Sequence, residues 1–148
     1  MSATMQPTKD QWKRIEEALS GAYGSVDLDV DGYALRLEVR RTGTLRYEIL
    51  PFVNGWNKGE WISNDCEERR RFLRPVTRRL YSPAKVAEMT RRLTKRAATE
   101  FIERFKLDAS HTYYLLSWPS MRSLRRHLVK NNERIRLLRI HNTEELQA

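Results

Sequence analysis

The chain contains little cysteine and no long apolar segment. One cysteine in 148 residues rules out an internal disulfide, so the sequence gives no sign of an oxidising compartment. No apolar run approaches the roughly 18 residues that span a bilayer, and the opening residues MSATMQPTKD lack the basic-then-apolar pattern of a secretory signal. We therefore expect a cytoplasmic protein with no membrane partner.

The sequence also lacks the motifs of common catalytic and cofactor sites. It has no G-x-S-x-G elbow, no Walker A loop and no dinucleotide-binding fingerprint. His111, His127 and His141 fall in three different predicted elements, and none has a second histidine three or four residues away to complete a helical metal pair. Cys66 stands among acidic residues, which disfavour a reactive thiolate. We predict that the protein is not an enzyme and has no metal site, cofactor or catalytic residue.

One calcium-loop pattern is present, but strand periodicity explains it better. Asp27, Asp29, Asp31, Gly32 and Glu38 match the spacing of a calcium-binding loop. Apolar residues alternate with these positions as on half-buried strands, and Asp-Gly is a preferred hairpin turn pair. A calcium loop also needs a helix after it, and the strand-like alternation continues instead. We therefore predict a β-hairpin without calcium.

Hydrophobic spacing in the first half predicts one helix and then a sheet. Thr8 and Gln11 form a capping box that begins a helix from about Lys9 to Ser20, which Gly21 ends. Period-two alternation then indicates antiparallel strands, the third of which Pro51 ends or forces to a sheet edge. The expected strands cover residues 25–30, 35–39, 45–49 and 56–62.

The second half is richer in helix. Ser82 and Pro83 form an N-terminal cap, and apolar residues at three- to four-residue spacing predict one helix of roughly 23 residues as far as Phe105. The other expected elements are a helix over 66–73 broken by Pro75, a buried strand over 113–118, a helix after Ser120 with an apolar stripe of Met121, Leu124 and Leu128, and a strand over 135–140.

These elements predict an α+β fold. It consists of an N-terminal helix, an antiparallel β-meander of about four strands, and a helix-rich basic half with one or two further strands. We expect a flexible lead-in over residues 1–7, a single α+β domain over residues 8–141 and a frayed tail over residues 142–148.

Charge is divided unevenly along the chain, whose formal net charge is +9. Residues 1–68 hold 8 Lys and Arg against 12 Asp and Glu, whereas residues 69–148 hold 20 against 7. Arginine, which can fork around a phosphate, dominates the basic clusters. The residues that we predict to bind nucleic acid or a partner are Arg69, Arg70, Arg71, Arg74, Arg78, Arg79, Arg91, Arg92, Lys95, Arg96, Arg122, Arg125, Arg126 and Lys130.

Two other interpretations of these charges and rings stay open. The basic clusters can form a solvated helix surface without a partner, and the aromatic residues can fill the core instead of stacking on bases. Trp56 and Trp61 flank a polar loop in which one ring can be exposed. The other aromatic residues that we consider for stacking are Tyr23, Tyr81, Tyr113, Tyr114 and Trp118.

Five segments carry a resemblance to a group of small proteins encoded by tailed phages and prophages of proteobacteria. They are PTKDQWKRIEEAL, YGSVDLDVDGYALRLEV, LRYEILPFVNGWNKGEW, CEERRRFLRPVTRRLYSP and WPSMRSLRRHLVKNN, within residues 7–137. The resemblance implies a small accessory gene product inside a bacterial host cell. Genes of this kind commonly encode proteins that handle nucleic acid or disable host defences. It supplies no activity and no functional residue.

Three functions follow from these observations. The first is a non-enzymatic phage-type accessory protein that binds nucleic acid or a nucleoprotein complex through its basic helices. The alternative is an anti-CRISPR-like inhibitor of a bacterial defence system that binds a host protein, either with its basic half or with an acidic sheet face. That face would comprise Asp27, Asp29, Asp31 and Glu48. A nuclease is the third, and its carboxylates would have to come from Asp65, Glu67 and Glu68.

Overall fold

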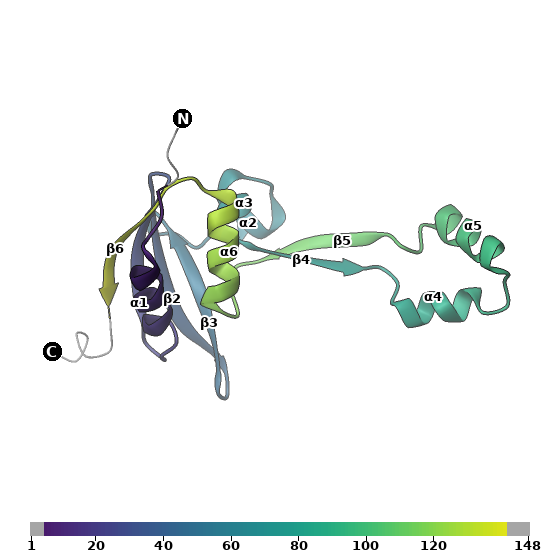
Figure 1. The fold of residues 1–148 in the computed structure, drawn as a ribbon, viewed down its shortest axis with the longest axis horizontal. Helices are drawn as coiled ribbons and strands as arrows, with labels where there is room; N and C mark the ends of the chain where they lie inside the picture. Colours follow the sequence, from purple (N-terminus) through teal and green to yellow (C-terminus); the bar gives the residue numbers. More distant parts are fainter. Residues whose placement is uncertain (1–4, 142–148) are drawn as a thin grey trace. The chain divides into compact units, whose positions relative to one another are not determined.

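A computed structural model describes residues 5–141, which form an α+β fold of six helices and six strands (Figure 1). In chain order these elements are α1 (Lys9–Ala18), β1 (Ser25–Val30), β2 (Tyr33–Gly43), β3 (Arg46–Val53), α2 (Glu60–Ser63), α3 (Glu67–Phe72), β4 (Arg74–Arg79), α4 (Pro83–Thr90), α5 (Lys95–Phe105), β5 (Ser110–Leu115), α6 (Met121–Asn131) and β6 (Ile135–His141). None of the helices in this range is long and apolar enough to cross a membrane.

The described chain divides into two compact units. Unit 1 comprises residues 5–74 and 114–141, and unit 2 comprises Pro75–Tyr113. The prediction of a single domain over residues 8–141 stays a prediction, since two compact units can belong to one domain. Within the expected lead-in, Met5 forms a β-bridge with Arg134 and Pro7 is buried. Residues 1–4 and the expected tail over residues 142–148 lie outside the described residues.

The sheet of unit 1 is antiparallel, with strand order β3-β2-β1-β6. The first three strands form a meander, as predicted, and Asp31 and Gly32 make the turn between β1 and β2 with positive φ angles of 49° and 88°. These angles suit Asp and Gly, and the hairpin replaces the calcium loop. Pro51 lies inside β3, where it is tolerated because β3 is an edge strand.

The predicted fourth strand over residues 56–62 is wrong. After the turn at Asn54 and Gly55 the chain enters α2, whose Trp61 side chain is buried in the core. The fourth strand is instead β6, which pairs with β1 from Val30 opposite Ile135 to Ser25 opposite His141. Because this pairing joins segments more than a hundred residues apart, no local pattern announces it.

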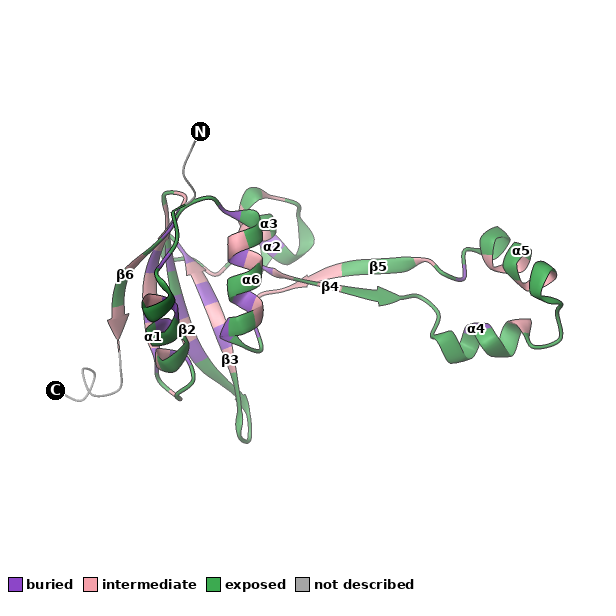
Figure 2. Cartoon of the chain, viewed as in Figure 1, coloured by how far each residue is buried: buried purple, intermediate pink, exposed green. Residues whose placement is uncertain are grey.

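The core of unit 1 lies between the sheet and two helices, α1 and α6, that cover one face of it (Figures 1 and 2). Residues of β1 and β2 alternate between this face and solvent, so Leu28 and Leu37 are fully buried. Leu124 and Leu128 of α6 are also fully buried, which confirms its predicted stripe. Each such side chain contributes roughly 1.5–3 kcal/mol of hydrophobic free energy.

Helix α1 begins at the predicted capping box but ends at Ala18, two residues earlier than expected. Gly24 lies against the last turn of this helix. A Cβ atom at Gly24 would lie 1.6 Å from the carbonyl oxygen of Ala18. The position therefore requires glycine for close approach of two backbone segments.

Unit 2 is a two-stranded ribbon, β4 and β5, with helices α4 and α5 between its strands in sequence (Figure 1). The predicted single helix from Ser82 to Phe105 is wrong. Thr94 adopts an extended conformation, and its hydroxyl accepts a hydrogen bond from the N–H of Ala97 at 3.2 Å, so it caps a second helix. The threonine side chain thus starts a new helix where the apolar spacing runs on without a break.

The ribbon also departs from the predicted buried strand over residues 113–118. Strand β5 covers Ser110–Leu115, and all of its residues are exposed or half-buried. A two-stranded ribbon has no second layer to cover its faces, so the side chains of β5 are not buried as they would be in the core of a sheet. Among the described residues of unit 2, Val86 and Leu107 are the buried apolar side chains.

Candidate nucleic-acid interface

The fourteen predicted basic residues occupy three parts of the fold. Residues 69–71 lie on α3, and Arg74, Arg78 and Arg79 lie on β4. The second group surrounds the break between α4 and α5, where one continuous helix was predicted. This group comprises Arg91, Arg92, Lys95 and Arg96. The third group lies on α6 and comprises Arg122, Arg125, Arg126 and Lys130.

Arg71 is held inside unit 1 by a network of polar contacts. Its guanidinium donates to Asp31 at 2.6 Å and to Asn132 at 2.8 Å, and it also pairs with Glu67 at 2.7 Å. Asp31 and Arg71 are both largely shielded from water, with side chains 16% and 24% exposed. Arg71 therefore joins α3 to the β1–β2 turn and to the end of α6, and it is not available to a phosphate.

Asp31 completes this network from the turn side. Its carboxylate accepts hydrogen bonds from the backbone N–H groups of Glu133 at 3.0 Å and Arg134 at 2.7 Å. Desolvation raises the pKa of Asp31, but these N–H groups and Arg71 outweigh it and hold the pKa below its usual value. The charged carboxylate is thus the form that the fold stabilises.

The other arginines of α3 also have partners in unit 1. The guanidinium of Arg69 lies 3.7 Å from the ring centroid of Tyr114, in cation–π contact. Arg70 pairs with Asp65 at 3.1 Å in an exposed position. In the α3 cluster, Arg69 and Arg71 therefore make structural contacts within unit 1, whereas Arg70 stays exposed.

Helix α6 presents its cations on the side away from the core. Arg125 lies over the ring of Trp12 at 4.7 Å. Arg122, Arg126 and Lys130 are exposed, and within the described range none of these three has a carboxylate at ion-pair distance. These three cations form a smaller basic surface on unit 1.

Unit 2 leaves almost all of its cations without an acidic partner among the described residues. It contains nine Lys and Arg against four Asp and Glu. Across the described residues it has one ion pair, between Arg96 and Glu100 at 3.6 Å, with both side chains mostly exposed. The cations without such a pair include Arg78, Arg79, Arg91, Arg92 and Lys95, all of them exposed.

Two cations of unit 2 occupy positions that disfavour their own helix. Lys95 and Arg96 begin α5, whose first turn contains no acidic residue. The N-terminus of a helix carries a partial positive charge, so cations there cost stability and an anion would relieve the repulsion. The sequence thus keeps positive charge at a position where helix stability favours Asp or Glu.

The sheet carboxylates are largely neutralised. Asp27 pairs with Arg36 at 2.8 Å and with His141 at 2.9 Å, and Asp29 approaches Arg136 at 3.5 Å. The hydrogen bond from Arg36, with a further one from His141, lowers the pKa of Asp27 despite partial burial. Asp31 is paired with Arg71, whereas Glu48, which accepts a hydrogen bond from Ser117 at 2.6 Å, has no cation partner among the described residues.

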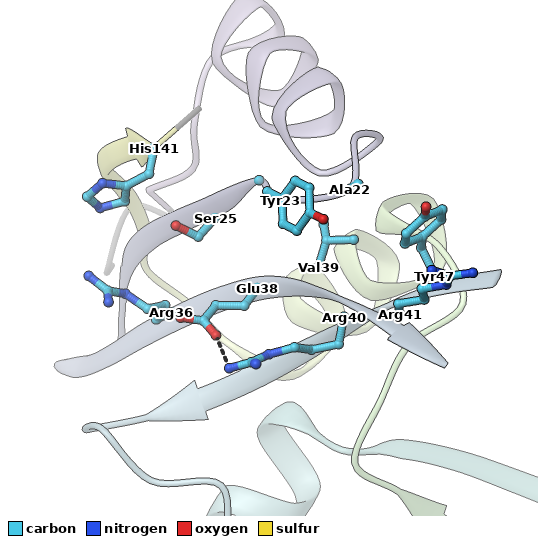
Figure 3. A pocket seen from close by; sticks show the side chains of 11 residues that line it. Ala22, Tyr23, Ser25, Arg36, Glu38, Val39, Arg40, Arg41, Tyr47 and His141 are labelled. Carbon is cyan, nitrogen blue, oxygen red and sulfur yellow. Dashed lines mark hydrogen bonds and ion pairs between the residues drawn. The ribbon is translucent and has the colours of Figure 1, made fainter. Parts of the chain in front are cut away.

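A hollow of about 710 Å³ on unit 1 was not predicted from the sequence (Figure 3). It lies where β2 continues past the start of β1, and it is lined by arginines and exposed tyrosines. The arginines are Arg36, Arg40 and Arg41, and the tyrosines are Tyr23 and Tyr47. The sequence did not reveal this cluster, because acidic residues outnumber basic residues in the first half of the chain. The adjacent pair Arg40 and Arg41 was the local signal that could have indicated it. Arg40 is already paired with Glu38 at 2.7 Å.

Of the two tryptophans that flank the polar loop, Trp56 has an exposed ring and Trp61 a buried one. Trp56 is 63% exposed and has the ammonium of Lys58 at 5.4 Å from its ring centroid, whereas Trp61 is in the core. Trp118 is also buried, and its indole N–H donates to the carbonyl of Phe72 at 2.9 Å. Trp61 and Trp118 therefore follow the interpretation in which aromatic residues fill the core.

The described part of the chain contains no group of three or more His, Cys, Asp and Glu residues placed to hold a metal ion. His127 instead has a structural environment at the boundary of α6 and α3. Its Nε2 lies 2.9 Å from the carbonyl oxygen of Arg70, and its Nδ1 lies 3.2 Å from the amide nitrogen of Asn131. The neutral ring, with the proton on Nε2, satisfies both contacts.

The protein should lose stability as the pH falls below the usual pKa of histidine, and His127 should contribute to this loss. Burial lowers the pKa of His127 from 6.5, and Lys130 adds to the effect, although the hydrogen bond to Arg70 opposes it. The unfolded chain therefore binds the proton first. His127 contributes full stability above pH 6.5 and loses it as the pH falls through the lowered folded pKa.

Urea unfolding across this pH range checks the expectation. The difference between the wild type and His127→Gln isolates the contribution of this ring, because His111 and His141 are present in both proteins. We expect the wild type to lose more stability than the variant between neutral and mildly acidic pH. Parallel pH profiles for the two proteins would contradict the neutral state of His127.

Comparisons with protein-family models, with curated proteins and with solved structures found no match to this chain. The resemblance to phage and prophage proteins therefore stays an expectation. The geometry of the basic residues is the principal guide to function.

Proposed function

We propose that this protein binds nucleic acid, without catalysing a reaction, through the exposed cations of unit 2. One observation carries the proposal: the cations around the α4–α5 break have almost no internal acidic partners, and two of them stand at a helix N-terminus that disfavours them. Phosphates supply the missing negative charge. An accessory role in a bacterial cell infected by a phage, as the resemblance implies, is part of the same proposal.

The expected mode of binding is electrostatic and tolerant of sequence. Arginine guanidinium groups donate paired hydrogen bonds to phosphate oxygens, and contact with the phosphates releases condensed counterions. Phosphate contacts carry no base information, so sequence preference should be weak. The exposed cations of α6 can add contacts of the same kind.

Fluorescence anisotropy with labelled single strands and duplexes tests the proposal. For about five phosphate contacts, affinity should fall roughly 10²-fold between about 50 and 200 mM salt. Absence of binding to both DNA and RNA at about 50 mM salt, where phosphate contacts are strongest, would rule the proposal out.

A second candidate is an inhibitor of a bacterial defence system that binds a host protein. The observation in its favour is that unit 2 exposes large apolar side chains, including Leu80, Met89, Leu93 and Phe105. Apolar surface of this kind is typical of protein contacts. A pull-down from nuclease-treated host lysate separates the two candidates, because a stoichiometric protein partner that survives the treatment favours the inhibitor.

A further inference from the structure

We propose that the β4–β5 ribbon carries an aromatic platform, formed by His111 and Tyr113, on which the bases of single-stranded nucleic acid stack. The inference rests on the proposed function and names its substrate class. The two rings lie nearly parallel, with 6.1 Å between their centroids and 25° between their planes. His111 is exposed and Tyr113 half-buried, so ring surface is open to a ligand.

The register of the ribbon places a cation beside these rings. The hydroxyl oxygens of Thr77 and Thr112 are 2.8 Å apart, so these two residues lie opposite each other on one face. Successive side chains of a strand alternate between faces. Arg78, next to Thr77, therefore shares the other face with His111 and Tyr113, and its side chain makes no ion pair within the described range.

This combination of groups suits a nucleotide. A flat ring offers its face to any base, and a neighbouring guanidinium binds the phosphate that joins it to the next nucleotide. The rings do not belong to the core of unit 2, since Val86 and Leu107 are the apolar residues buried there in the described structure. The rings therefore lie outside this core and keep part of their surface open.

The platform favours single strands over duplexes. In a duplex both faces of each base are covered by its neighbours, whereas an unpaired base can leave the strand's own stack and lie on a protein ring. Because every base has such a face, the platform adds affinity without adding sequence specificity. The cations of unit 2 supply the phosphate contacts, and the rings distinguish strands with accessible bases.

An abasic strand of the same length and phosphate count provides the direct test. Anisotropy should show that the full-length wild-type protein binds the base-bearing strand roughly 5- to 150-fold more tightly than the abasic one, the range expected for one stacked base. The double variant His111→Ala, Tyr113→Ala should lose this difference and keep its affinity for the abasic strand. Thr77→Val changes the opposite face of the ribbon, so it should behave as the wild type.

Each other outcome decides between the two proposals. Equal wild-type affinity for base-bearing and abasic strands, equal affinity for single strands and duplexes, or a double variant that keeps the difference would overturn the platform and leave the proposed function standing. If no strand binds at low salt, the proposed function and the platform fall together. Circular dichroism of the variants confirms that the ribbon and helices remain folded.

Discussion

Replacing Asp31 with alanine should lower the free energy of unfolding by about 3 kcal/mol. The change leaves the largely shielded guanidinium of Arg71 without its closest partner, at 2.6 Å in the native protein. It also leaves the backbone N–H groups of Glu133 and Arg134 without their acceptor. Urea unfolding followed by tryptophan fluorescence measures the loss, because Trp12, Trp61 and Trp118 are all buried in unit 1.

Two further variants test whether the carboxylate network is the cause. Asp31→Asn keeps a side chain that tolerates the positive φ of 49° and keeps one oxygen acceptor, so its loss should be smaller. Asp65→Ala removes the exposed partner of Arg70 and should cost less than about 0.5 kcal/mol. Equal losses for Asp31→Ala and Asp65→Ala would contradict a structural role for the Asp31 network.

Removing the cations around the α4–α5 break should produce the largest effect on binding. A variant with four substitutions to alanine should bind single strands about 10²–10³-fold more weakly at about 0.1 M salt, since each lost phosphate contact also lowers the salt slope by about 0.7. The substituted residues are Arg91, Arg92, Lys95 and Arg96. The stability of α5 should not fall, because the change relieves the repulsion at its N-terminus.

A charge-matched control separates local contact from net charge. Four exposed cations of unit 1 can be replaced by alanine to give the same total charge, and they are Lys9, Lys13, Arg14 and Lys58. This control should bind within about threefold of the wild type, because none of its four residues belongs to the proposed site and salt screens exposed charges that do not contact the strand. Equal loss in both variants would show that net charge, rather than the α4–α5 break, determines binding.

Short-range signals in the sequence predicted the parts of the fold that depend on neighbouring residues. The capping box of Thr8 and Gln11, the Asp31-Gly32 turn and the stripe of α6 all lie where expected. Such signals act within a few residues, where backbone geometry and periodicity dominate. The break at Thr94 was missed because the apolar spacing continues across it, although a threonine three residues before Ala97 is itself a capping signal.

Long-range contacts account for the rest of the differences. The pairing of β6 with β1 and the ion pair between Arg71 and Asp31 join residues far apart in the chain, so no local pattern contains them. The sequence located the basic clusters. For the same reason, however, it could not show which arginines hold unit 1 together and which stay exposed. In the first half, acidic residues concealed the arginines of the hollow in Figure 3.

The most direct test is an NMR titration of the isotopically labelled protein with an unlabelled single strand at low salt. We predict that the largest chemical-shift changes fall on residues 78–79 and 91–96 and on the rings of His111 and Tyr113, and that added salt reverses them. Shift changes confined to the sheet and helices of unit 1, or a spectrum that the strand leaves unchanged, would contradict binding through unit 2.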